Sequence, residues 1–501
     1  MSDIRPSIAQ HYHQRTKYDP ATIAQRGKAL DFAEQPQPFK TYKVGTEIDL
    51  KPHLEAEGSL GLHRLSRLLY YSYGVTAMVP YPDHPIYLRA APSAGGLYPA
   101  EIYLIAREDS TLPAGLYNYQ VRTHSLWRFW DNQVWSRLEE ACLWHPALAT
   151  TQLVLVVTAV FWRSAWRYED RAYRRIFLDS GHLLGNLELA AAMTDYRPHL
   201  MGGFVDEALN QLLYLDDEQE GAIAALALAD LLEVDQNLPS TPTALPSETD
   251  VDYPEILEGE LLPYCHEASE IYALDAAYPK DRPTPEIEDK YNFPFCLKVP
   301  TTSQPILWGD DLAELAETIR TRRSTRQFTG AAITLADLSA LLDFTYHPEQ
   351  YQEQGLDPNP DTFDLSLIQT FVAVSDVTGL EAGCYYYAAQ AEELRQIRFK
   401  NFRRELHYLC LQQDLGRDAA AVIFHTADLG VAIARYGDRA YRYLHMDAGY
   451  LGQRLNLAAI RLDLGVSGIA GFFDDHVNEV LGIPTDEAVL YITTLGQPRK
   501  A

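Results

Sequence analysis

The chain has 501 residues, and its 69 acidic and 42 basic side chains give a formal net charge of −27. This length predicts two or three domains, and an apolar fraction of 47% is typical of a globular protein. The acidic balance disfavours a nucleic-acid partner and an anionic membrane surface, and no apolar run reaches the roughly 18 residues of a transmembrane helix.

The five cysteines are widely spaced, and none of them forms a C-x-x-C pair. This pattern favours neither a disulfide framework nor a zinc site. No HExxH, paired-carboxylate or nucleophile-elbow pattern is present, so metal and hydrolytic chemistry have no support. The first residues, MSDIRPSIAQHYHQRTK, lack the apolar stretch of a signal peptide. We therefore expect a cytoplasmic protein without a metal site.

After an N-terminal extension (residues 1–50), a first compact unit is expected over residues 51–233, which we call copy one. Its pattern predicts a helix at 62–73, where leucines recur at helical spacing, and an alternating strand at 100–106. A hairpin-like stretch, a buried strand at 153–160 and a long helix at 173–193 follow. Such mixing of helices and hairpins is typical of an α+β fold.

The same order of elements occurs a second time. RYEDRAYRR begins at Arg167 and RYGDRAYRY at Arg435, an offset of 435 − 167 = 268, and Arg167–Ala191 and Arg435–Ala459 share 14 of 25 residues. At the same offset LVLVVTAV (153–160) matches AVIFHTAD (421–428), and GGFVD (202–206) matches AGFFD (470–474). Residues 311–501 therefore form copy two.

Residues 234–310 separate the copies. The stretch LPSTPTALPSETDVDYPEILEGE is acidic and rich in Pro, Ser and Thr, which predicts an extended connector that buries no core. Two copies tied in this way amount to a homodimer written into one chain. We expect the copies to pack against one another as a pseudo-dimer.

The copies differ in the motifs that could hold a ligand. Copy one has APSAGGLYPAE (91–101), whose Ser93, Ala94, Gly95 and Gly96 would let a flat ligand approach the backbone, whereas the aligned PDTFDLSLIQ of copy two has no glycine. Copy two instead gathers cations and a hydroxyl suited to a phosphate, namely Arg322, Arg323, Ser324, Arg326, Arg499 and Lys500. Taken singly, these strings are typical of a turn, a solvated helix face and a frayed tail. Their segregation predicts one complete site per chain, with half from each copy.

The strings RRSTRQF, SAGGLYPAE, RYGDRAYR, DSGHLLGN, AGFFDD and LGQPRK resemble those of the nitroreductase-like FMN flavoproteins, and among them the SagB-type dehydrogenases, which include the SagB/ThcOx-like azoline oxidases. The resemblance covers nearly the whole chain. It implies a nitroreductase-like fold in two tandem copies, with FMN at their interface. Arg322, Arg323, Ser324, Arg326, Arg499 and Lys500 would then hold the phosphate and ribityl chain. Ser93–Gly96 of copy one would complete the site together with Gly471 and Phe472 of AGFFDD, and the reciprocal site would be vestigial.

The resemblance also implies an activity, the oxidation of thiazoline or oxazoline rings in ribosomal peptides of the cyanobactin kind to thiazoles or oxazoles. The partners would be an azoline-containing peptide and a cyclodehydratase complex or a second copy of the chain. Two alternatives remain open: an NAD(P)H-dependent reductase of quinones or nitroaromatics, and a flavin-free scaffold of a peptide-modifying complex.

In the SagB-type family a Lys-Tyr pair assists proton removal at the flavin, and here arginine stands in the lysine position of both copies. Arginine stays protonated and cannot act as an ordinary base, so the proton would go to a tyrosine. We expect Tyr436 with Arg435 to serve, and Tyr168 with Arg167 is the runner-up. In the alternative interpretation RYxDRAYR is a charge-paired helix start in which Asp170 and Asp438 balance arginines. His182 of DSGHLLGN is expected to be a packed core residue rather than a flavin contact.

Overall fold

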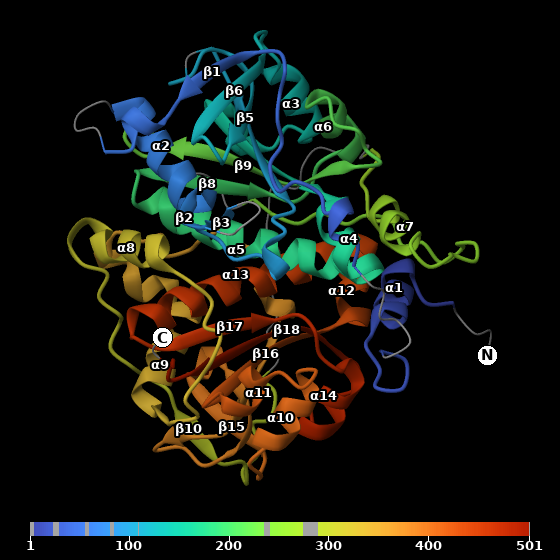
Figure 1. Ribbon diagram of the computed structural model, residues 1–501, viewed down its shortest axis with the longest axis vertical. Coiled ribbons are helices and arrows are strands. Elements are labelled where there is room, and N and C mark those ends of the chain that lie inside the picture. Colours follow the sequence, from blue (N-terminus) through green and yellow to red (C-terminus); the bar gives the residue numbers. More distant parts are fainter. Residues whose placement is uncertain are drawn as a thin grey trace.

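The protein is described by a computed structural model that covers residues 5–23, 30–55, 60–80, 85–108, 110–234, 241–273 and 289–499. Two antiparallel sheets lie at opposite ends of the molecule, and the long helices α5 (Ala172–Ala192) and α13 (Ala440–Arg461) lie between them (Figure 1). The predicted α+β fold, with two tandem copies packed as a pseudo-dimer within one chain, is confirmed.

The two large sheets have the same strand order. The first runs β1 (Thr46–Asp49), β6 (Ser125–Trp130), β5 (Gly115–Gln120), β4 (Ala100–Ala106), β7 (Leu153–Val160), β9 (Glu220–Asp230) and β8 (Tyr196–Met201). The second runs β10 (Lys298–Pro300), β15 (Glu393–Arg398), β14 (Gly383–Ala388), β12 (Gln369–Val374), β16 (Ala421–Asp428), β18 (Glu487–Gly496) and β17 (Gly465–Ile469). Small two-stranded sheets join β2 (Val75–Val79) with β3 (Ile86–Arg89) and β11 (Ile333–Thr334) with β13 (Val377–Thr378). The central strands β4, β7 and β16 are mostly apolar and are buried along nearly their whole length, because helices cover both faces of their sheets.

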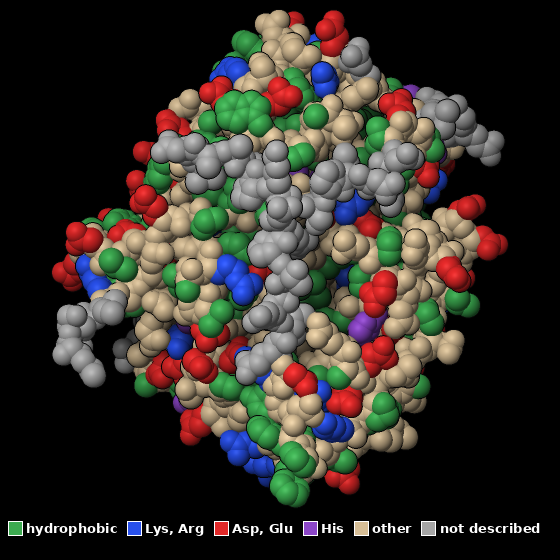
Figure 2. Space-filling model, turned by 180° about the vertical axis from the view of Figure 1, so that it is seen from behind, with side chains coloured by type: hydrophobic (Ala, Val, Ile, Leu, Met, Phe, Trp, Pro, Cys, Tyr) green, Lys and Arg blue, Asp and Glu red, His purple; other side chains and the backbone are tan. Residues whose placement is uncertain are grey.

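Most of the remaining helices occur in corresponding places in the two copies, whereas α8 and α11 have no α-helix as a counterpart among the described residues of copy one. Copy one and the segment before it contain α1 (Ile8–Thr16), α2 (Leu60–Tyr73), α3 (Trp135–Ala141), α4 (Phe161–Tyr168) and α6 (Asp206–Leu212). Copy two and the segment before it contain α7 (Leu261–Ala268), α8 (Ala313–Thr321), α9 (Leu335–Tyr346), α10 (Arg403–Leu409), α11 (Asp414–Asp418), α12 (Leu429–Tyr436) and α14 (Asp474–Leu481). None of the described helices combines the length and apolar character that crossing a membrane requires. Acidic side chains are spread over the face in Figure 2 without gathering into one patch.

Helices α5 and α13 approach each other most closely at a pair of glycines. A Cβ atom on Gly181 would lie 2.1 Å from the carbonyl oxygen of Met446, and one on Gly449 would lie 2.2 Å from that of Leu178. Any side chain at either position would push the two backbones apart. The repeated glycine of DSGH and DAGY therefore fixes the crossing on which the pseudo-dimer is built.

Helices α1 and α7 precede the two copies and take equivalent places. The backbone N–H of Ala9 donates to Asp438 (3.0 Å) and that of Leu262 donates to Asp170 (3.0 Å), so each carboxylate caps the start of one helix. One histidine from each helix then meets a tyrosine of the repeated string, at 3.1 Å for His13 with Tyr441 and 3.2 Å for His266 with Tyr173. The repeated unit thus includes a helix from the N-terminal extension and one from the segment between the copies.

The described part of residues 234–310 is not extended chain throughout. Ala244, Leu245 and Tyr253 are buried, as are Leu261 and Cys265 of α7. These apolar residues are few, but they lie against the core that the two copies share, so they need no core of their own. The boundaries predicted for the four regions stay a prediction.

Two buried clusters of charge join the copies. In each, one carboxylate from the first turn of a short helix accepts hydrogen bonds from two arginines at the start of the long helix of the other copy. Asp474 is bonded by Arg171 (2.9 Å) and Arg174 (2.7 Å), and Asp206 by Arg439 (2.7 Å) and Arg442 (2.9 Å). All six side chains are buried. The arginines of DRAYR therefore pair with the aspartates of GGFVD and AGFFD across the interface, whereas Asp170 and Asp438 of the same strings cap helices.

We predict that Asp474→Ala lowers the free energy of unfolding by about 3–5 kcal/mol, because it leaves two buried guanidinium groups without their counter-charge. The measurement is urea unfolding. The matched control is the next residue, Asp475, which is exposed and pairs with Lys17 at 2.6 Å. Asp475→Ala should cost less than about 1 kcal/mol. Equal losses in the two variants would contradict the role given to the buried cluster.

Candidate functional site

The cation-rich motif of copy two lies beside the C-terminal strand. After α8 ends at Thr321, the N–H of Thr325 donates to the carbonyl of Val466 (2.8 Å), and that of Arg499 donates to the carbonyl of Gln327 (3.0 Å). These bonds bring Arg326 and Arg499, both exposed, to the same edge of the sheet. Lys500 lies outside the described residues. The structure thus brings RRSTR together with the end of LGQPR.

Arg322 and Arg323 reach across to copy one. The Nε of Arg322 donates to the carbonyl of Ala90 (2.7 Å), and Arg323 donates to the hydroxyl of Thr76 (3.2 Å). Burial lowers the pKa of Arg322 to about 10. Its Nη1 atom is buried without a hydrogen-bond partner among the described residues. An unpartnered guanidinium nitrogen at a buried interface is suited to an anionic ligand.

The serine-glycine loop of copy one lies on the other side of this interface. Asp179 of α5 fastens it, because its carboxylate accepts from the Ser93 hydroxyl (2.5 Å) and from the Ala94 N–H (3.1 Å). Gly95 and Gly96 follow with φ of 66° and 68°, in the left-handed region, and both are exposed. A Cβ atom on Gly96 would meet nothing within 4 Å, so the loop is open on that side. Its backbone is accessible to a ligand in the way the sequence predicts.

Tyr168, at the end of α4, lies directly against this loop. A Cβ atom on Gly95 would lie 2.8 Å from the Tyr168 hydroxyl and 3.5 Å from Cδ of Arg167. The guanidinium of Arg175 stacks on the Tyr168 ring at 3.9 Å, and its Nη2 would lie 3.6 Å from a Cβ on Gly471 of copy two. Burial raises the pKa of Tyr168, and Arg175 and Arg167 partly oppose that rise. We call the set formed by Arg322–Arg326, Ser93–Gly96, Tyr168, Arg175 and Gly471 the interface site. Phe472, which follows Gly471, is buried.

Tyr436 and Arg435 occupy the corresponding place on the opposite side of the pseudo-dimer. Both bond Asp364, with 2.9 Å from the Tyr436 hydroxyl and 2.7 Å from Arg435. Burial and then Asp364 raise the pKa of Tyr436. Asp364 belongs to the segment that aligns with the serine-glycine loop, and its N–H donates to Asp447 (2.8 Å) as Ala94 donates to Asp179. The preferred tyrosine of the sequence prediction thus lies away from the glycine loop, and the runner-up lies against it.

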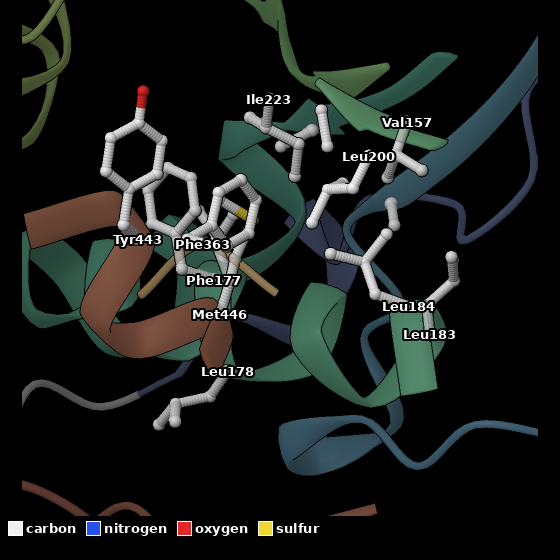
Figure 3. Close-up of a cluster of buried hydrophobic side chains, with 14 of the residues drawn as sticks. Val157, Phe177, Leu178, Leu183, Leu184, Leu200, Ile223, Phe363, Tyr443 and Met446 are labelled. Atoms are coloured by element: carbon white, nitrogen blue, oxygen red, sulfur yellow. The ribbon is translucent and has the colours of Figure 1, made fainter. Parts of the chain in front are cut away.

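Apolar side chains fill the opposite side. At the repeat offset of 268, Leu184 and Leu200 replace Gly452 and Gly468, and both line an apolar cluster with Phe363. Figure 3 shows this cluster, in which the rings of Phe363 and Tyr443 stack at 4.8 Å and Leu184 and Leu200 face the same space. On the side of the glycine loop, Tyr491 packs on the two glycines: a Cβ atom on Gly452 would lie 2.6 Å from Cε1 of Tyr491, and one on Gly468 would lie 1.7 Å from its hydroxyl oxygen. The two sides are therefore packed by different side chains, and a vestigial second site stays a prediction.

His182 of α5 is buried and bonded on both nitrogens, to Gln453 (2.8 Å) and to the Tyr491 hydroxyl (2.9 Å). Burial lowers the pKa of His182 to about 4, so the ring is neutral near pH 7. It packs between the copies, as expected from the sequence. Among the described residues, no group of His, Cys, Asp and Glu side chains is placed to hold a metal ion.

Three residues that bear on the site were not singled out from the sequence for this role. Arg175 stands where copy two has Tyr443, and Asp364 lies in the segment that aligns with Gly96 and its neighbours. These differences between the copies are the signal from which both residues could be found. Tyr18 comes from the N-terminal extension, where no repeat had been recognised.

Comparison with known proteins places these features in context. The Nitroreductase family pattern matches residues 69–229 and 319–497. A crystal structure of a protein provisionally described as a nitroreductase, from Anabaena variabilis ATCC 29413, is 65% identical, with 99% of this chain and 100% of that chain covered and a TM-score of 0.95. MJ1384 of Methanocaldococcus jannaschii, provisionally named a nitroreductase, is 30% identical over 34% of this chain and 85% of its own length. The trifolitoxin-processing protein TfxF of Rhizobium leguminosarum bv. trifolii is 26% identical over 30% of this chain, which spans 55% of TfxF.

We predict that Asp179 makes stability depend on pH. Burial raises the pKa of Asp179 to about 7, whereas an unfolded aspartate titrates near about 4. The folded state therefore holds the proton more tightly, and the contribution of Asp179 to stability, present at low pH, is lost as the pH rises to about 7. Between pH 5 and 8, wild type should lose up to about 3 kcal/mol of unfolding free energy relative to Asp179→Asn, measured with urea. Equal pH dependence in the two proteins would contradict this.

Proposed function

Since the chain belongs to the nitroreductase family, an oxidoreductase family, we propose that it binds one FMN at the interface site and uses it to oxidise a substrate. The observation that carries the proposal is the asymmetry of the two sides. Unpaired cations of copy two face an open glycine loop of copy one on one side only, and on the other side Asp364, Leu184 and Leu200 occupy the corresponding places.

The residues of the interface site fit the parts of FMN. The unpartnered Nη1 of Arg322, together with Arg323, Ser324, Arg326 and Arg499, would hold the phosphate, for which guanidinium groups are suited. The exposed backbone of Gly95 and Gly96, and that of Gly471 opposite, would lie along the flat ring system. When bound, FMN supplies a hydride acceptor, and the protein supplies position and proton transfer.

We assign the proton transfer to Tyr168. Its hydroxyl borders Gly95, at 2.8 Å from where a Cβ atom on that glycine would lie. Arg167 and Arg175 provide positive charge that stabilises the phenolate form, although neither can accept the proton. Tyr436, by contrast, already donates to Asp364, and a carboxylate at 2.9 Å opposes loss of the phenol proton.

For the substrate we propose thiazoline or oxazoline rings in a ribosomal peptide, which become thiazoles or oxazoles. The SagB-type resemblance favours this reaction, and the similarity to a protein named for processing trifolitoxin favours biosynthetic processing over the general reduction of small oxidants. In this reaction the ring loses one hydrogen as a proton, which the phenolate form of Tyr168 accepts, and the neighbouring hydrogen as a hydride. Oxygen would then take the electrons.

We predict one FMN per chain, and we expect Arg323→Ala to lose most of it. The substitution removes a charge-assisted phosphate contact worth about 1.5–3 kcal/mol, so FMN affinity should fall roughly tenfold or more. FMN released from denatured protein is measured by absorbance. Arg320→Ala is the control, because Arg320 lies three residues away on α8, is exposed and pairs with Glu317 at 2.6 Å. Two FMN per chain, or equal loss in both variants, would refute the single-site assignment.

We predict that Tyr168→Phe keeps FMN but lowers azoline turnover by about 10²-fold or more, the scale expected for a lost general base. Tyr436→Phe, the matched variant on the opposite side, should change turnover less than threefold on the same scale. The assay incubates enzyme with a thiazoline peptide in air and follows the loss of two hydrogens by mass spectrometry. Loss of turnover only in Tyr436→Phe would reverse the assignment. No turnover of azolines together with brisk NADPH-driven quinone reduction would favour the reductase alternative.

A further inference from the structure

The N-terminal segment places Tyr18 in the interface site. After α1 the backbone forms a bridge with Phe473, and the Tyr18 N–H donates to Asp474 (2.9 Å), the carboxylate of one buried charge cluster. The Tyr18 ring would lie 3.9 Å from a Cβ atom on Gly471. Tyr18 thus reaches the site from a segment that is distant in sequence from the loop of copy one and from Gly471 of copy two.

Arg175 links Tyr18 to Tyr168. Its Nη2 donates to the Tyr18 hydroxyl at 3.4 Å, and its guanidinium covers the Tyr168 ring. The side chain is 94% buried, and its Nη1 has no hydrogen-bond partner among the described residues. A buried guanidinium that lacks a partner on one side is costly unless a ligand supplies an acceptor there.

The opposite side of the pseudo-dimer lacks this arrangement. The residue equivalent to Tyr18 is Ile271, whose N–H donates to Asp206 (2.9 Å) as that of Tyr18 donates to Asp474, but whose side chain is apolar. Tyr443 replaces Arg175, and its hydroxyl is bonded to the carbonyls of Gly202 and Leu245, both at 2.9 Å. The backbone frame is therefore the same on both sides, but Ile271 and Tyr443 stand where the glycine-loop side has the phenol of Tyr18 and the guanidinium of Arg175.

We propose that Arg175 and Tyr18 form an oxyanion-binding site that holds the oxygen of a carbonyl or carboxylate group of the substrate. This inference rests on the function proposed above. In an azoline peptide the carbonyl group is attached to the ring carbon that loses its proton. As Tyr168 takes that proton, the electron pair of the C–H bond moves onto the carbonyl oxygen, where Arg175 and the Tyr18 hydroxyl stabilise the charge.

The electrostatics of Tyr18 suit a hydrogen-bond donor to an oxyanion. Burial alone would raise its pKa, but the guanidinium groups of Arg175 and Arg171 outweigh burial, so the pKa of Tyr18 is lowered from its usual value. The ring of Tyr18 also lies 4.1 Å from the Arg171 guanidinium, which is fixed by its own bond to Asp474. A phenol of this kind is a strong donor that is held in place.

The test measures binding of two carboxylates, benzoate and thiazole-4-carboxylate, to FMN-loaded protein by calorimetry, without turnover. Tyr18→Phe removes only the hydroxyl and should weaken both carboxylates by about tenfold, the effect of one lost hydrogen bond to a charged group, while FMN content and the affinity for neutral thiazole stay unchanged. Arg175→Lys keeps the charge but not the planar fork and should weaken both further. Ile271→Val, on the opposite side, is the matched control and should change neither.

Equal carboxylate affinity in wild type, Tyr18→Phe and Arg175→Lys would overturn the proposal. It would also be overturned if the two variants lost FMN but still bound carboxylates as wild type does. If benzoate binds and depends on Tyr18 while thiazole-4-carboxylate does not bind, the oxyanion site stands and the azoline substrate is wrong. If the purified protein takes up no FMN, the same titrations still report on Tyr18 and Arg175, because neither requires flavin chemistry.

Discussion

The buried contacts between two arginines of one copy and one aspartate of the other are the constraint on which the arrangement of the pseudo-dimer depends. Asp474 and Asp206 each pair with two buried guanidinium groups. Each aspartate also accepts an N–H from the segment that precedes a copy, at Tyr18 and Ile271. A buried charge must keep its partners. These contacts therefore fix the positions of α5, α13, α6 and α14 relative to one another, and also those of the segments that contain Tyr18 and Ile271.

This constraint is the same on both sides of the pseudo-dimer. The residues of the interface site, by contrast, differ between the two sides. The capping of the loops by Asp179 and Asp447 is kept, and so are the close contact of Gly181 with Gly449 and the two arginine clusters. The residues that differ lie between these fixed points. The side of the glycine loop has a glycine, Arg175 and Tyr18, and the equivalent positions on the other side are Asp364, Tyr443 and Ile271. The scaffold is thus symmetric because the buried charge pairs hold both sides together. The side chains that lie between these pairs are free to diverge.

Much of this was predictable from the sequence, because the repeat at an offset of 268 fixes the order of elements twice and the loss of motifs shows which half keeps which part. Two things were not. The repeat of α1 and α7 lies in dissimilar strings, so it is revealed by equivalent contacts in the structure, such as those of His13 with Tyr441 and of His266 with Tyr173. The choice between Tyr168 and Tyr436 depends on which helix end faces the glycine loop, and both tyrosines follow an arginine in nearly the same string, so the string alone does not show which one makes that contact.

Fusion of the copies explains why such divergence is possible. In a dimer of two identical chains, a substitution that places an aspartate in the loop, as at Asp364, would appear on both sides and close both sites. In a single chain the same substitution closes one side, and that side can then gain packing from larger apolar residues such as Leu184 and Leu200 in place of glycines. In the function proposed above, the side of Asp364 contributes packing to the interface, whereas the side of the glycine loop keeps its glycines and the unpartnered nitrogens of Arg175 and Arg322. The division of labour therefore follows from one fixed frame of buried charge and from two halves that mutate independently.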